Sequence, residues 1–300
     1  MSLVYGSLQL GFLYGIMVLG IYISFRILDI PDLTTEGSFA FGLSVSALLT
    51  KLGHPCLGLV AGIAAGFLAG TVTGILQSLL KIHPILAGIL TMSALYSINI
   101  MILGAPNLSL LSSQTVFTNI GSTFANVDKD IIKLGIVVVL ALISVAFLIW
   151  FFKTHFGLCI RAVGDNQEML KASSVNVNIT KTIALGVANA FIGFSGAVTA
   201  QYQGSADINS SAGILVVGLA SVIIGEAIFG NRSVTLGLIS AVVGSIVYRF
   251  IVALATKYSI FPSYFFKFIS AVIVAIALAL PAIKAAAGKH RIKKEGRADA

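Results

Sequence analysis

Charged side chains are scarce in this sequence. Asp, Glu, Lys and Arg make up only 10% of its 300 residues, whereas 57% of the residues are apolar. Soluble domains contain about 25% charged residues. Several apolar runs of about twenty residues separate the few charges, which is the length that crosses a bilayer as a helix. These proportions exclude an ordinary soluble domain and predict an all-α polytopic membrane protein.

Cysteine is also rare, and the common catalytic motifs are absent. Cys56 and Cys159 have no metal-ligand spacing. Because Cys159 falls in a segment that we expect in the cytoplasm, a structural disulfide between them is not expected. The chain has no G-x-x-x-x-G-K-[ST] phosphate loop, nucleophile elbow or metal motif. We therefore expect a chain that is not an enzyme, with no catalytic, cofactor-binding or metal residues.

Where charge does occur, it is mostly basic, and the net charge is +8. Six basic residues cluster near the C-terminus: Lys284, Lys289, Arg291, Lys293, Lys294 and Arg297. Such clusters are typical of cytoplasmic tails and can contact anionic lipid. We expect residues 1–288 to form the membrane domain and 289–300 to form a basic cytoplasmic tail, with no binding to nucleic acid.

The apolar runs predict about nine transmembrane helices. The N-terminus has no basic n-region and no convincing cleavage site, so its first apolar run is expected to be a retained span. The expected spans are 5–28, 36–51, 56–80, 84–104, 131–152, 180–201, 213–229, 233–256 and 264–284. The spans 36–51 and 213–229 are short and are interrupted by glycine or serine. The sequence leaves open whether these two cross the membrane fully.

The basic residues predict the orientation of the spans. The loop 153–180 contains Lys153, Arg161 and Lys171, and the tail is more basic still. If the loop and the tail both lie in the cytoplasm, an even number of spans must separate them, and four expected spans do. The polar loop 105–130 then lies outside, and so does the N-terminus if the span 36–51 crosses fully. The expected location is a bacterial cytoplasmic membrane.

The two short segments have similar surroundings. One span is followed by "DIPDLTTEGSFAFGLSVSALL" and another by "SADINSSAGILVVGLASVIIG". Each stretch has an acidic residue, hydroxyl residues and a glycine before a short apolar run. The two units, about 5–104 and 180–284, are offset by five spans, so they would lie in opposite orientations. Inverted repeats of this kind are common in transporters, which handle substrate near the repeat interface.

The third expected span contains a stripe of glycines at a spacing of four: Gly58, Gly62, Gly66, Gly70 and Gly74. On a helix, this stripe forms a groove that a neighbouring backbone can approach closely. We expect it to pack against another helix.

Uncharged polar residues within the spans are candidates for a translocation path. They are Asn99, Asn189, Ser195, Gln201 and Tyr248. The sequence leaves open whether each contacts substrate or forms a hydrogen bond between helices. Arg249 is expected near the outer end of its span, where its stem can reach the membrane surface.

The stretch Arg161–Asn178, "RAVGDNQEMLKASSVNVN", is the most polar part between two spans. Asp165 and Glu168 have the spacing of a capping box, and good helix formers follow until "SSVNVN". This pattern predicts a short surface helix with Met169 and Leu170 available to a partner. A solvated connecting loop is the alternative.

Two long stretches resemble a known family. The stretch "GLCIRAVGDNQEMLKASSVNVNITKTIALGVANAFIGFSGAVTAQ" is similar to the cytoplasmic loop and following span of ABC permeases for branched-chain amino acids and ribose. The stretch "LQLGFLYGIMVLGIYISFRILDIPDLTTEGSFAFG" is similar to their first span and its sequel. The pieces "PDLTTEGSF" and "GEAIFG" look like a subgroup named for tryptophan and tyrosine import.

The resemblance implies a fold, partners and an energy source. The fold would be that of the type II, cobalamin-type ABC importers without their first helix. The loop 153–180 would couple to a separate ATPase subunit that binds ATP and Mg²⁺, through Arg161, Asp165, Glu168, Met169, Leu170 and Lys171. An extracytoplasmic solute-binding protein would deliver a small solute, an amino acid and in this subgroup an aromatic one. A second copy of the chain would complete a homodimer, with a paralogue as the alternative partner.

Two other functions remain open at this point. An ion-coupled secondary transporter would have an inverted repeat but no ATPase subunit. A membrane scaffold or channel would need neither the repeat nor the cytoplasmic helix.

Overall fold

The computed structural model describes residues 2–123, 128–172, 175–230 and 233–258, together with 271, 272 and 275. The expected ninth span, 264–284, lies almost wholly outside these residues, and the basic tail 289–300 lies entirely outside them. The other expected spans correspond to helices. The protein is therefore an all-α polytopic membrane protein, as predicted, and seven of the described helices are long and apolar enough to cross a membrane.

The N-terminal half contains four long helices. α1 covers Ser2–Ile21 and continues into a π-helix, η1, at Tyr22–Ile27. α2 covers Thr35–Lys51, α3 covers Pro55–Ser78 and α4 covers Pro84–Leu103. Proline at the first position favours the starts of α3 and α4, since its missing N–H would have no partner inside the helix.

The middle of the chain contains shorter elements. β1 covers Asn107–Ser109, α5 covers Val116–Thr123 and α6 covers Lys129–Phe151. Between the long helices α6 and α9 lie α7, His155–Asp165, and α8, Gln167–Ala172.

The C-terminal half begins with α9, Val177–Gln203, followed by β2, Ser205–Asp207, and the short 3₁₀ helix η2, Ile208–Ser211. α10 covers Ile214–Phe229 and α11 covers Val234–Tyr258. β1 and β2 form an antiparallel ribbon in which Leu108 pairs with Ala206. The ribbon joins the end of α4 to the end of α9, and both helices end at a glycine in the left-handed conformation, Gly104 and Gly204.

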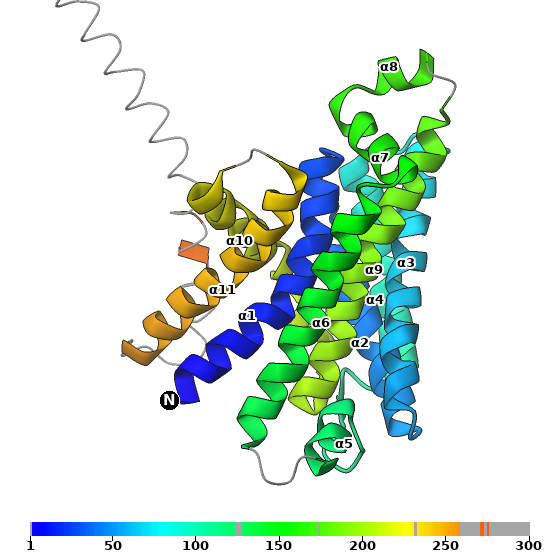
Figure 1. Ribbon diagram of the computed structural model, residues 1–300. Coiled ribbons are helices and arrows are strands. Elements are labelled where there is room, and N and C mark those ends of the chain that lie inside the picture. The colour runs from blue at the N-terminus through cyan, green and yellow to red at the C-terminus, as the bar shows by residue number, and fades with distance from the viewer. Residues whose placement is uncertain are drawn as a thin grey trace, which may run out of the picture.

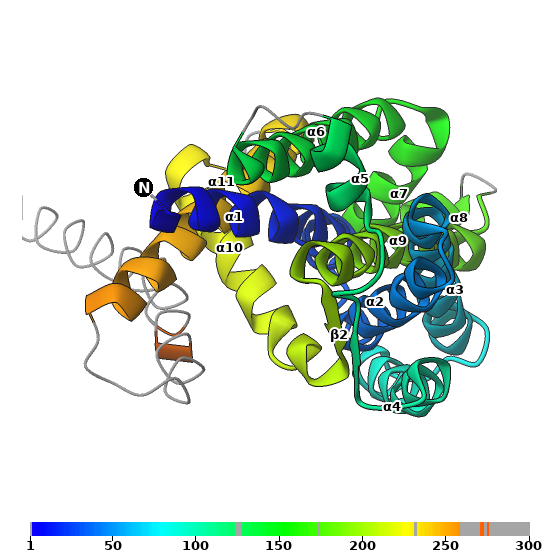
Figure 2. The ribbon, with the colours of Figure 1, turned by 90° about the horizontal axis from the view of Figure 1, so that it is seen from below.

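The helices form one bundle with two distinct ends. Figure 1 shows α7 and α8 together at one end, here called the α7 end, and α5 at the other, here called the α5 end. The N-terminus lies toward the α5 end. In the view from below, α9 is central, with α1, α10 and α11 on one side and α3 and α4 on the other (Figure 2).

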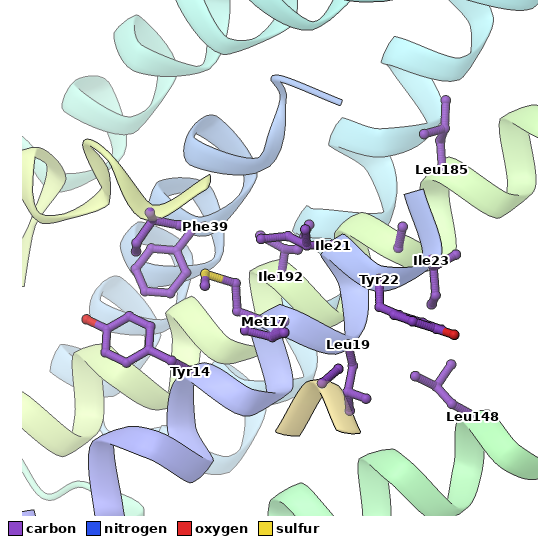
Figure 3. Packing of buried hydrophobic residues seen from close by; sticks show 14 of the residues in the cluster. Tyr14, Met17, Leu19, Ile21, Tyr22, Ile23, Phe39, Leu148, Leu185 and Ile192 are labelled. Carbon is purple, nitrogen blue, oxygen red and sulfur yellow. The ribbon is translucent and has the colours of Figure 1, made fainter. Parts of the chain in front are cut away.

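The buried core joins α1, α2, α6 and α9. Figure 3 shows Met17 and Ile21 of α1 near Ile192 of α9 and Phe39 of α2, whereas Leu19 lies on the side of Leu148 of α6. The rings of Tyr14 and Phe39 stack with centroids 6.3 Å apart. Backbone contacts strengthen this core, since Ser195 donates a hydrogen bond of 2.8 Å to the carbonyl oxygen of Leu13. α9 is thereby fixed against α1 along its length.

α2 and α10 begin inside the bundle and run to opposite ends. The first residues of α2 lie beside the middle of α4, because a Cβ at Gly37 would lie 3.0 Å from the Cα of Met92. α10 begins beside the same point, because the Gly213 N–H donates to Glu36. α2 ends at the α5 end, where Ser46 contacts Gln201. α10 ends at the α7 end, where Glu226 pairs with Arg26 at 2.8 Å. Neither helix therefore spans the bundle from end to end.

Candidate functional site

The starts of α2 and α10 meet beside a cavity of about 330 Å³. At its rim, Oε1 of Glu36 accepts a hydrogen bond of 2.9 Å from the backbone N–H of Gly213. The cavity lies between α2, α4 and η2, and the residues that line it are Glu36, Gly37, Ala40, Met92, Ser93, Tyr96, Asn99, Ile208, Asn209, Ser211 and Ala212. Two interior helix starts therefore hold a pocket that contains a carboxylate.

The turn before α2 places Glu36 at the cavity. After η1, Asp29 takes a left-handed conformation with φ of 54°, and the chain turns back into the bundle. Oδ1 of Asp32 then accepts from the Thr34 N–H at 2.9 Å, and the carbonyl oxygen of Asp32 accepts from the Thr35 hydroxyl at 3.0 Å. A side chain that binds the backbone two residues ahead is a turn former, so the sequence "PDLTT" starts α2 locally.

Two further contacts anchor this turn to the neighbouring helices. Oδ2 of Asp32 accepts a hydrogen bond of 2.7 Å from the Asn189 side chain on α9. The Thr34 hydroxyl lies 2.7 Å from that of Thr73 on α3, which in turn donates to Thr91 on α4 at 2.9 Å. The position of Glu36 is therefore set by α3, α4 and α9 together.

Asn99 is the buried polar residue of the cavity for which the described part of the chain offers no hydrogen-bond partner. Its side chain is 1% exposed, and neither its amide nitrogen nor its amide oxygen has a hydrogen-bond partner among the described residues. Leaving a buried polar group unpaired costs about 1–3 kcal/mol. Because buried polar groups in native proteins are nearly always paired, Asn99 is placed to bond to something that enters the cavity.

The other four path candidates do not line this cavity. Asn189 binds Asp32, and Ser195 binds the backbone of α1. Gln201 donates to Ser46 and to the carbonyl oxygen of Pro55, so it joins helices at the α5 end. Tyr248 is buried next to Ala220 on the far side of α1.

Sequence reasoning did not single out Glu36, Tyr96 or Asn209 as path residues. The available signal was the acidic residue shared by the two similar stretches. That residue is Asp32, which forms the turn before α2, and Asp207 in the second stretch, so the signal leads only to the neighbourhood of Glu36. The partner residues come from elements that are distant in the sequence.

A second cavity, of about 610 Å³, lies at the α5 end beside α5, α6 and the end of α9. Gln201 and Tyr202 line it, and the Tyr202 hydroxyl donates to Oε1 of Gln9 at 2.6 Å. The Lys133 ammonium group lies 5.6 Å from the centre of the Tyr202 ring. This cavity is therefore more basic than the first.

The glycine stripe of α3 lies largely against the backbone of α9. A Cβ at Gly66 would overlap the carbonyl oxygen of Asn189, and one at Gly70 would overlap that of Leu185. At Gly74 a Cβ would lie 2.6 Å from the Cα of Thr182, and at Gly62 it would lie 2.5 Å from the Cβ of Ala197. Gly58 faces α2 instead, where an added Cβ would lie 3.0 Å from the carbonyl oxygen of Ser46. The stripe therefore brings α3 into direct contact with α9.

The α7 end has two short helices where the sequence predicts one. The expected cap, Asp165, is the last residue of α7, because the helix continues through Arg161. The cap of α8 is Asn166, whose Oδ1 accepts from the N–H groups of Glu168 and Met169 at 3.1 Å each. Asparagine is as good an N-cap residue as aspartate. The position at which α7 ends therefore decides which of the two residues caps α8.

The exposure of α8 differs from the prediction in one residue. Met169 is 71% exposed, but Leu170 is only 8% exposed and belongs to the core of the bundle. Lys171 pairs with Glu168 at 2.7 Å on the surface. Lys181 of α9 donates to Gln167 at 2.8 Å and holds α8 on the bundle. Leu170 is therefore a packing residue and is not available to a partner.

α7 also contacts the end of η1. A Cβ at Gly164 would overlap the carbonyl oxygen of Ile27. A π-helix such as η1 is uncommon and is frequently found at functional sites. The chain leads from Ile27 through the Asp32 turn to Glu36, so the residue that α7 contacts is connected directly along the chain to the turn and the cavity.

Arg249 packs against an aromatic ring of a neighbouring helix, and its expected place near the membrane surface stays a prediction. Its guanidinium carbon lies 3.8 Å from the centre of the Tyr14 ring on α1. A cation over an aromatic face is attracted by the negative charge of the ring face. The residue is half-buried within the bundle because α1 offers that ring.

A polytopic helical bundle with two interior helix starts at a polar cavity defines a membrane transport protein. The comparisons with known proteins identify the family. The family model for the permease component of branched-chain amino acid transport systems matches residues 3–278. The chain therefore belongs to that family.

Two relatives illustrate the range of the family. A tyrosine transport system permease protein from Clostridioides difficile is 33% identical over 265 residues, which cover 88% of this chain and 86% of the relative. A galactose/methyl galactoside import permease protein from Escherichia coli is 30% identical over 214 residues, which cover 70% of this chain and 62% of the relative. No solved structure matches significantly. The family resemblance seen in the sequence is thus confirmed.

Proposed function

We propose that this chain is the transmembrane permease of an ATP-driven importer for an amino acid, with an aromatic amino acid as the favoured substrate. The cavity at the starts of α2 and α10 carries the proposal. It places the Glu36 carboxylate and the Asn99 side-chain amide inside the helical bundle of a chain that belongs to a permease family. The match to a tyrosine permease over most of both chains supports an aromatic substrate.

The energy source is a separate ATPase subunit that binds ATP and Mg²⁺ and docks on α7 and α8. The exposed side chain of Met169 supports this docking, as do the charged residues Arg161 on α7 and Glu168 and Lys171 on α8. Movement of α7 reaches the cavity through Gly164, which lies against Ile27 at the end of η1. The Asp32 turn and Glu36 follow directly along the chain.

The permease works as a homodimer in a bacterial cytoplasmic membrane, with the α7 end in the cytoplasm. Lys153, Arg161 and Lys171 at this end support the orientation. A solute-binding protein delivers substrate to the α5 end. Each chain has its own α7–α8 element, so two copies provide a docking site for each of two ATPase subunits.

The experiment is uptake of radiolabelled L-tyrosine into proteoliposomes that contain the permease, its ATPase and its binding protein. We expect uptake only with ATP and Mg²⁺ on the α7 side. Uptake driven by a sodium or proton gradient without the ATPase would overturn the proposal and favour a secondary transporter.

A further inference from the structure

The cavity between α2, α4 and η2 has a one-sided charge. Glu36 contributes a carboxylate, and the described residues that line the cavity include no Lys, Arg or His. The ion pairs among the described residues are Arg26 with Glu226 and Lys171 with Glu168, and neither involves Glu36. A carboxylate that has no ion-pair partner in a helical bundle favours the binding of a ligand with a cationic group. It disfavours the binding of an anionic ligand that has no such group.

Glu36 is already oriented for such a group. One of its oxygens, Oε1, is fixed by the Gly213 N–H at 2.9 Å. The hydrogen bond comes from the start of α10, which lies 177 residues further along the chain. Because this contact fixes one oxygen, the other can accept a hydrogen bond from a ligand with little loss of side-chain freedom.

α4 supplies the opposite wall of the cavity. Met92, Tyr96 and Asn99 lie four and three residues apart, so they share one face of the helix. Met92 and Tyr96 are a flexible apolar chain and an aromatic ring, whereas the buried Asn99 offers both an N–H donor and an oxygen acceptor. This face therefore combines an apolar surface with one polar anchor.

We propose that this cavity holds an α-amino acid in transit, with its ammonium group on Glu36, its carboxylate on the Asn99 amide N–H and its side chain against Met92 and Tyr96. The volume of about 330 Å³ suits a small ligand. The inference rests on the proposed function and adds a site on the permease that distinguishes an amino acid from a sugar.

The test uses the purified complex of permease and ATPase, without the binding protein, and the photoreactive probe 4-azido-L-phenylalanine. We expect ultraviolet labelling of the α4 peptide that contains Met92 and Tyr96. L-Tyrosine should protect this peptide best, and tyramine, which lacks the carboxylate, should protect it less. 3-(4-Hydroxyphenyl)propionate, which lacks the ammonium group, and galactose should not protect it.

Two variants separate the two anchors. Glu36→Gln keeps an oxygen that can accept from the Gly213 N–H but removes the charge, so labelling should fall at least fivefold. Asn99→Leu should remove the advantage of L-tyrosine over tyramine. Asp128→Asn removes an exposed carboxylate outside the cavity and serves as the matched control, with labelling equal to that of the parent. Thermal unfolding of each variant verifies that it is folded.

The inference is overturned if a folded Glu36→Gln protein is labelled like the parent, if galactose protects as well as L-tyrosine, or if the label lies outside the cavity. The uptake assay is a separate test. ATP-driven tyrosine uptake without labelling of the cavity would reject this inference and retain the proposed function. Protected labelling without ATP-driven uptake would reject the proposed function and retain the site.

Discussion

The side-chain amide of Asn189 donates a hydrogen bond of 2.7 Å to Oδ2 of Asp32, and so joins α9 to the turn that starts α2. Both residues are at most 3% exposed. Burial shields the Asp32 carboxylate from water. The hydrogen bond from Asn189 replaces hydrogen bonds to water that the carboxylate would otherwise lose without compensation.

Asn189→Leu should therefore destabilise the permease by about 1–3 kcal/mol, the cost of an unsatisfied buried group. Thermal unfolding in detergent measures this change. Asn178→Ala, on the exposed first turn of the same helix, is the control and should unfold like the parent. Equal stability of Asn189→Leu and the parent would show that the contact does not hold the turn.

Gly66→Leu should separate α3 from α9, since even a Cβ at this position overlaps the Asn189 carbonyl oxygen. Overpacking in a close-packed interior costs about 1–3 kcal/mol, and a leucine against backbone should cost at least that much. The yield of monodisperse protein and its unfolding temperature measure the effect.

Gly135→Ala on α6 is the control for this substitution, because a Cβ there meets nothing within 4 Å. Alanine should leave the protein as stable as the parent, or slightly more stable, since it favours a helix over glycine by about 1 kcal/mol. A Gly66→Leu protein as stable as the control would mean that the stripe has no packing role.

Met169→Asp should weaken docking of the ATPase without unfolding the permease, because the side chain is 71% exposed. Anchor residues in protein interfaces typically contribute about 2 kcal/mol or more. Pull-down of the ATPase measures docking. Leu111→Asp changes an apolar residue at the α5 end that is even more exposed, at 87%, and is the control that should leave the pull-down unchanged.

Leu170→Asp should behave differently from its neighbour. The side chain is 8% exposed and packs in the core, so a carboxylate there should lower the unfolding temperature of the permease itself. A folded Leu170→Asp protein that merely loses the ATPase would place Leu170 in the interface and contradict the packing role.

Gly164→Val should separate ATP hydrolysis from transport. The valine would press on the Ile27 carbonyl oxygen and disturb the contact between α7 and η1, while Met169 stays exposed. We expect the ATPase to bind and hydrolyse ATP, with tyrosine uptake lowered at least tenfold. Gly6→Ala, where a Cβ meets nothing within 4 Å, is the control. Normal uptake by folded Gly164→Val would exclude this route of coupling.

Much of the fold could be predicted from the sequence because its signals are local. The apolar runs predicted the eight long helices, α1 to α4, α6 and α9 to α11, to within a few residues at most ends, but they did not predict α5 or α7. Proline at residues 55 and 84 and glycine at 104 and 204 mark helix ends through their own backbone preferences. The family resemblance also rested on contiguous stretches of sequence.

The errors arose where the competing element was distant or where two local signals were nearly equal. Asp165 and Asn166 are both good caps, and the continuation of α7 through Asp165 decided between them. Leu170 and Met169 are both apolar, and only the packing of α8 on the bundle buries one of them. The contact of Arg249 with Tyr14 could not be predicted either, because Tyr14 lies on a helix at the other end of the sequence.

The sequence by itself determined that this protein is a helical membrane permease, because hydrophobic length and contiguous motifs need no tertiary contact to be recognised. It also marked the glycine face of α3 and one polar helix in the 153–180 loop. Only the tertiary structure decided which polar residues form a site. Asn189, Ser195 and Gln201 bind other parts of the protein, whereas Asn99 is left unpaired beside Glu36. The physical reason is that hydrogen bonding of a buried group depends on its neighbours in space, and α2, α4 and η2 meet only when α9 brings the two halves of the chain together.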